Sequence, residues 1–96
     1  MSRVSCTITL YEGRWGRKPS RESLEKTIRR AADGDCWLEE LEFVKPDEDV
    51  AFEMEASVTT DWSDEENVRD KIIERLLARF KPEYESMVEV EVNDAS

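Results

Sequence analysis

Glutamates at two-residue spacing are the side chains of this sequence that best indicate a function. They occur in three segments and comprise Glu40, Glu42, Glu53, Glu55, Glu89 and Glu91. A repeat of two residues is the period of a β-strand, so the members of each pair would lie on one face of a strand, about 7 Å apart. Carboxylates at that spacing approximate the phosphates along one strand of nucleic acid. The pattern therefore predicts a surface that binds a basic, nucleic-acid-binding protein.

The residues that would support catalysis or metal binding are scarce. The chain has no histidine, so the commonest general base and the usual serine and cysteine triads are missing. Its two cysteines, Cys6 and Cys36, supply at most half of a structural zinc site, and we expect them to be reduced thiols. The acidic turns at 33–35 and 47–49 do not extend into a calcium-binding loop, and no glycine-rich phosphate loop is present. We therefore expect a protein that is not an enzyme and that holds no metal or cofactor.

A basic segment near the amino terminus offers a different binding chemistry. Residues 1–30 hold eight basic and three acidic residues, a net charge of +5, whereas residues 31–96 hold six basic and twenty-one acidic residues, a net charge of −15. Basic side chains beside an exposed tryptophan can hold an anion, unless the tryptophan folds back over the core. The alternative hypothesis is therefore a regulatory ligand-binding or dimerisation domain whose loop holds an anion. The residues concerned are Arg14, Trp15, Arg17, Lys18 and Arg21.

The elements that would position these side chains follow from the spacing of the apolar residues. Alternation predicts strands over 4–11, 37–44, 50–59 and 87–93, with a bulge at Glu39 and with Met87 on the polar side of the last strand. Helical spacing predicts one helix from Ser20 to about residue 32, and a second from a capping box at Ser63 to a stop before Pro82. The predicted core comprises Val4, Cys6, Ile8, Leu10, Leu24, Ile28, Phe52, Met54, Val58, Val68, Ile72, Leu76, Val88 and Val90.

The order of these elements, β-α-β-β-α-β, resembles the ferredoxin-like superfold over the whole chain, residues 1–96, as a single domain. The resemblance implies an α+β sandwich, in which a four-stranded antiparallel sheet of order 4-1-3-2 carries two helices on one face. The other face would be open and would present the six glutamates. The same face would present Ser5, Thr7, Thr9 and Tyr11 between them. Charged outer strands also keep a sheet soluble, which is the competing explanation for the glutamates.

The overall charge and the apolar runs limit the partners and the location. The net charge of −10 disfavours direct binding to nucleic acid or to an anionic membrane. No apolar run is long enough to span a membrane and no secretory signal is visible, so a cytoplasmic location is expected. In composition the chain resembles small phage-encoded inhibitors of host defence. We therefore expect a non-enzymatic binding module or inhibitor of the nucleic-acid-mimic type, and its oligomeric state is left open.

Overall fold

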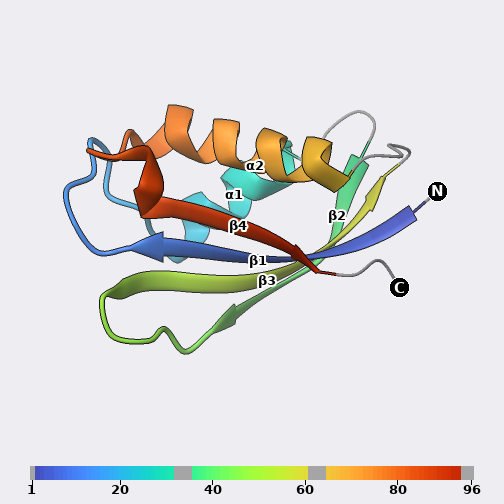
Figure 1. Ribbon diagram of the computed structural model, residues 1–96, viewed down its shortest axis with the longest axis horizontal. Helices are drawn as coiled ribbons and strands as arrows, with labels where there is room; N and C mark the ends of the chain where they lie inside the picture. The colour runs from blue at the N-terminus through green and yellow to red at the C-terminus, as the bar shows by residue number, and fades with distance from the viewer. Residues whose placement is uncertain (1, 32–35, 61–64, 94–96) are drawn as a thin grey trace.

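The computed structural model describes residues 2–31, 36–60 and 65–93, which form an α+β protein with one antiparallel sheet and two helices (Figure 1). The sheet has the order β2-β3-β1-β4, which is the predicted order 4-1-3-2 read from the opposite edge. Figure 1 shows both helices on the same side of the sheet. Along the chain the elements are β1 (Ser2–Tyr11), α1 (Arg21–Ala31), β2 (Cys36–Val44), β3 (Val50–Thr60), α2 (Glu65–Phe80), the 3₁₀ turn η1 (Glu85–Met87) and β4 (Val88–Asn93).

Helix α1 begins where the sequence predicts, because two serines satisfy the free amides of its first turn. The backbone N–H of Ser23 donates to Ser20 Oγ at 3.2 Å, and the N–H of Ser20 donates to Ser23 Oγ at 2.9 Å. This reciprocal arrangement is a capping box with serine in place of the usual glutamate. Leu24 and Ile28, four residues apart, are fully buried and fix the helix to the sheet.

Helix α2 buries a stripe of residues at four-residue spacing, which includes Val68, Ile72, Leu76 and Phe80. It ends at Phe80, two residues before Pro82, as expected. Lys81 then takes a left-handed backbone conformation (φ 47°), and its N–H donates to the carbonyl of Leu77 at 3.0 Å. The capping box predicted at Ser63 lies outside the described residues.

The predicted core is confirmed with one exception and one correction. All of its members are buried except Phe52, which is partly buried and packs against the core. Met87 was expected on the polar side of the last strand, but it is 8% exposed and ends the 3₁₀ turn before β4. The alternation therefore starts at Val88, and the Met87 side chain lies against Gly13, where an added Cβ would come within 2.7 Å of Met87 Cε.

The register of the strands confirms the predicted bulge in β2. Leu38 pairs with Val58 and Glu40 pairs with Ser57, so Glu39 is the extra residue. Strand β3 lies between β1 and β2, which separates the backbones of Cys6 and Cys36 as the expectation of reduced thiols requires. Within the described ranges, no helix has the length and apolar character needed to cross a membrane.

Candidate functional site

The antiparallel register brings the outward-facing residues of all four strands into rows that run across the open side of the sheet. Residues directly opposite each other on neighbouring strands have Cβ atoms about 5 Å apart. All six glutamates predicted from the sequence lie in three adjacent rows of this face, which we call the acidic face. From β2 to β4 the rows are Val44, Glu53, Thr9 and Glu89; Glu42, Glu55, Thr7 and Glu91; and Glu40, Ser57, Ser5 and Asn93.

The acidic face places like charges side by side. Glu42 lies directly opposite Glu55, and this arrangement destabilises an antiparallel pair. Among the described strand residues that point to this side, the one basic residue is Arg3, at the far end of the sheet. Its Nε lies 3.2 Å from Ser57 Oγ and 3.6 Å from Glu39 Oε2, so its charge is already shared. The centre of the face therefore keeps an uncompensated negative charge.

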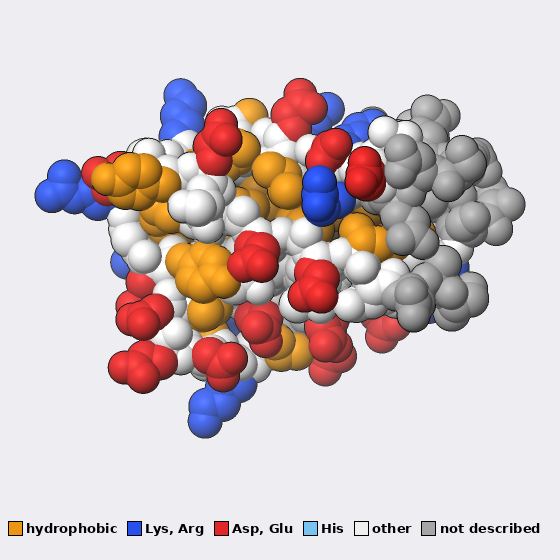
Figure 2. All heavy atoms as spheres, viewed as in Figure 1, with side chains coloured by type: hydrophobic (Ala, Val, Ile, Leu, Met, Phe, Trp, Pro, Cys, Tyr) orange, Lys and Arg blue, Asp and Glu red, His pale blue; other side chains and the backbone are white. Residues whose placement is uncertain are grey.

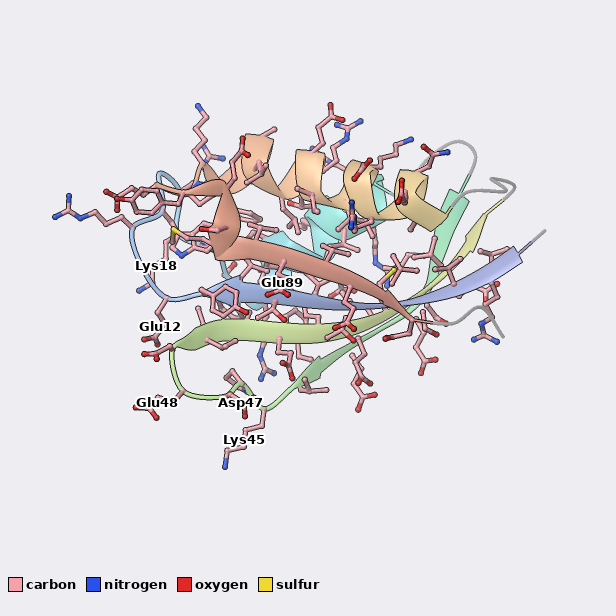
Figure 3. All side chains as sticks on the ribbon, in the orientation of Figure 1. Glu12, Lys18, Lys45, Asp47, Glu48 and Glu89 are labelled. Carbon is pink, nitrogen blue, oxygen red and sulfur yellow. The ribbon has the colours of Figure 1, made fainter. Side chains whose placement is uncertain are left out.

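The negative surface of the acidic face contains a hollow and continues beyond the strands. Figure 2 shows acidic side chains gathered over the lower part of the molecule, below the helices. A shallow depression of about 260 Å³ lies among the second and third rows, lined in part by Glu40, Glu42 and Glu55. Figure 3 shows Glu12, Asp47 and Glu48 at the end of the sheet where the β2–β3 turn lies, with Lys45 beside them, so acidic residues outnumber the basic one there.

Among the described residues, two side-chain hydrogen bonds cross the acidic face from β1 to β4: one joins Asn93 Nδ2 to Thr7 Oγ1 at 3.2 Å, and the other involves a glutamate. The hydroxyl of Tyr11 donates a hydrogen bond of 2.6 Å to Glu89 Oε2. This bond raises the pKa of Tyr11, because ionising the phenol would remove the donor; partial burial and the negative charges of Glu89 and Glu53 raise it further. The face therefore has one glutamate held by a side-chain hydrogen bond, a half-buried Glu53, and four exposed glutamates on β2, β3 and β4.

The basic segment of the alternative hypothesis is folded onto the end of α2. The N–H groups of Gly16 and Arg17 donate to the carbonyls of Lys81 and Phe80 at 2.8 and 2.9 Å. These amides satisfy the carboxyl end of the helix, so they are already engaged and do not form a cradle for an anion. Gly16 is required at this contact, because an added Cβ would lie 2.9 Å from the Lys81 Cβ and 3.0 Å from its carbonyl oxygen.

The side chains of this loop divide into packed and exposed groups. Trp15 is partly buried against the core, and its Nε1 donates to the carbonyl of Tyr11 at 3.2 Å. The Arg21 guanidinium lies 5.3 Å from the centre of the Phe43 ring, in cation–π contact. Arg14, Arg17 and Lys18 are exposed. Trp15 therefore packs at the edge of the core and is not available to stack on a ligand. Of the five candidate residues, the side chains without such a contact are those of Arg14, Arg17 and Lys18.

Sequence reasoning missed a second basic cluster, which lies between the two helices. Lys26 and Arg30 of α1 and Arg75 and Arg79 of α2 line one hollow of about 240 Å³. Each pair is four residues apart on its helix, so the spacing in the sequence could have indicated that each pair shares a helix face. Their convergence depends on the packing of α1 against α2, which the local pattern does not determine.

The chemistry of the acidic face is that of a charged surface rather than of a metal centre. In the part of the chain that the structure describes, no three Cys, Asp or Glu side chains lie close enough together to hold a metal ion. The six glutamates are instead spread over three strands, β2, β3 and β4, at spacings that suit several separate cations. A scan against family models and searches of the curated proteins and of the solved structures found no match to this chain.

Proposed function

We propose that this protein is a non-enzymatic binding module whose acidic face binds a basic, nucleic-acid-binding protein and competes with nucleic acid for it. The observation that supports the proposal is the clustering of six glutamates in three adjacent rows, with Glu42 directly opposite Glu55. A surface built only for solubility needs charge, but it gains nothing from placing like charges opposite each other. Alternating lysine and glutamate across the strands would keep the sheet soluble and would also stabilise it.

The geometry of the face suits a partner whose cations normally contact phosphates. Along each strand the carboxylates, and therefore the rows, repeat at about 7 Å, and within a row neighbouring positions lie about 5 Å apart, so the face offers an array of negative charge. Arginine and lysine side chains that contact phosphates, and do not contact the bases, could bind these carboxylates instead, because carboxylates are also negatively charged hydrogen-bond acceptors. The Ser and Thr residues between the glutamates leave room for the ends of long basic side chains.

The proposal extends to the finer fold and to the location of the protein. We assign the chain to the ferredoxin-like sandwich, on the basis of its element order and its sheet order β2-β3-β1-β4. A cytoplasmic location is proposed with it, because a mimic of nucleic acid must meet its partner where nucleic acid is bound. In this type of inhibitor the acidic face replaces the nucleic acid, as in phage-encoded inhibitors of host defence.

The test is competition for one purified partner. Immobilised protein is used to capture basic proteins from a lysate, and one captured nucleic-acid-binding protein is then purified and mixed with labelled DNA or RNA. We expect added wild-type protein to displace the nucleic acid, and we expect its affinity to fall steeply with salt, since the Debye length is about 10 Å at 0.1 M salt. Simultaneous binding of the nucleic acid and this protein to the partner would overturn the mimic proposal.

A further inference from the structure

The outer side of the two helices carries a concentration of positive charge that the acidic face does not explain. Lys26, Arg30, Arg75 and Arg79 surround the hollow of about 240 Å³ between α1 and α2, together with the small residue Ala78 and the nearly buried Thr27. The helices cover the side of the sheet opposite to the acidic face (Figure 1), so this hollow and the acidic face point in different directions. We call it the helix groove.

The positive charge of the helix groove is largely uncompensated. Lys26 shares its charge with Glu22, whose Oε1 lies 3.2 Å from the Lys26 Nζ. Arg30, Arg75 and Arg79 form no ion pair within the described ranges, although the chain has 24 carboxylates. Like charges four residues apart on a helix repel each other, and both helices contain such a pair here. An anion bound between the helices would relieve both repulsions.

The size of the helix groove and its surroundings favour a compact anion. A half-open hollow of about 240 Å³ is smaller than the usual pocket for a drug-sized ligand and has room for a compact group such as a diphosphate or triphosphate. Guanidinium groups bind phosphoryl oxygens through paired hydrogen bonds. The next hollow along α2 is lined by Asp70 and Glu74 as well as by Lys71 and Arg75, so an extended polyanion would meet carboxylates there.

We propose that the helix groove binds a compact, multiply charged phosphoryl anion, such as a diphosphate or triphosphate group, through Arg30, Arg75, Arg79 and Lys26. The site is independent of the acidic face and of the partner proposed for it. Since the protein as a whole has a net charge of −10, its long-range field repels anions. Saturable binding of an anion would therefore report a local site.

The experiment is a titration of the full chain with inorganic tripolyphosphate, followed by calorimetry and by the amide chemical shifts of α1 and α2. We expect saturable binding with one site and shifts centred on the two helices. The double variant Arg30→Gln/Arg79→Gln should weaken binding at least tenfold. The matched double variant Arg14→Gln/Arg17→Gln, which changes the charge equally in the exposed loop, should leave binding within about twofold of wild type.

The affinities for different anions distinguish the possible ligands and include results that would overturn the proposed site. Equal affinity for tripolyphosphate and for a nucleoside triphosphate would show that the phosphates alone are recognised, and tighter binding of the nucleotide would add a contact with the base; both support the proposal. Absence of saturation at millimolar tripolyphosphate, or loss of binding in the loop variant but not in the groove variant, would overturn it. Tighter binding of a single-stranded oligonucleotide than of tripolyphosphate through the same arginines would also overturn the assignment to a compact anion. Since all four substituted arginines are exposed, unchanged thermal unfolding of both variants shows that any loss is not caused by unfolding.

Discussion

The repulsion between Glu42 and Glu55 lowers the stability of the fold, so a substitution that removes this repulsion should raise the free energy of unfolding. The two residues face each other across β2 and β3, so Glu42→Lys replaces a repulsive pair with an attractive one. Removing a like-charge pair and adding an opposite-charge pair are each worth about 0.2–1 kcal/mol in a sheet. We therefore expect the free energy of unfolding to rise by about 1 kcal/mol, and Tm to rise by about 5 °C for a domain of this size.

The assay compares this variant with one on the same strand and the same face. Glu40 lies opposite the uncharged Ser57, so Glu40→Lys makes the same change in charge without a carboxylate directly opposite. Urea unfolding of both variants at low salt should show a gain for Glu42→Lys that is at least twice the gain for Glu40→Lys. The difference should shrink in 1 M salt, where the Debye length is about 3 Å. Equal effects of the two substitutions, or a gain at Glu42 that salt does not reduce, would refute the reasoning from register.

Two further predictions concern the hydrogen bond across the acidic face and the packing of the loop after β1 on the end of α2. The pKa of Tyr11 is higher in the folded than in the unfolded protein, so its bond to Glu89 stabilises the fold below about pH 10, and this contribution is lost as pH rises through the folded pKa. In a Tyr84→Phe background, tyrosinate absorbance should show a lower pKa for Tyr11 after Glu89→Gln. An unchanged titration would contradict the hydrogen bond. Gly16→Ala should destabilise the protein by about 1–2 kcal/mol in urea unfolding, because the new Cβ presses on Lys81, and an unchanged midpoint would mean that the loop does not pack closely on α2.

The sequence was sufficient to predict what depends on local periodicity. Alternation in β3 and β4 placed Glu53, Glu55, Glu89 and Glu91 on one side of their strands, and the register observed in the structure aligns them in rows. The predicted start of the last strand at Met87 was wrong. The alternation of valines and glutamates in 88–92 can be extended back to Met87 in the sequence, but in the structure Met87 belongs to the 3₁₀ turn.

What the sequence could not predict depends on contacts between distant segments. The amides of Gly16 and Arg17 are taken by carbonyls more than sixty positions later, which weakens the case for an anion held by the loop. The helix groove likewise requires that α1 and α2 meet along the faces that carry Arg30 and Arg75. Spacing within one element indicates which residues share a face, but not which face of another element they will meet.

The central claim is that the acidic face, rather than the total charge, binds the partner, and charge reversal at matched positions tests it most directly. Glu55 and Glu91 flank Thr7 in the second row, whereas Glu83 and Glu85 are exposed away from the sheet face, so both double substitutions to lysine change the net charge by the same amount. The quantity to measure is the Kd for the purified basic partner at 0.1 M salt. We expect Glu55→Lys/Glu91→Lys to weaken binding roughly 10- to 100-fold and Glu83→Lys/Glu85→Lys to weaken it by less than about threefold. Equal weakening by both variants, or tight binding that survives reversal of Glu55 and Glu91, would contradict the account.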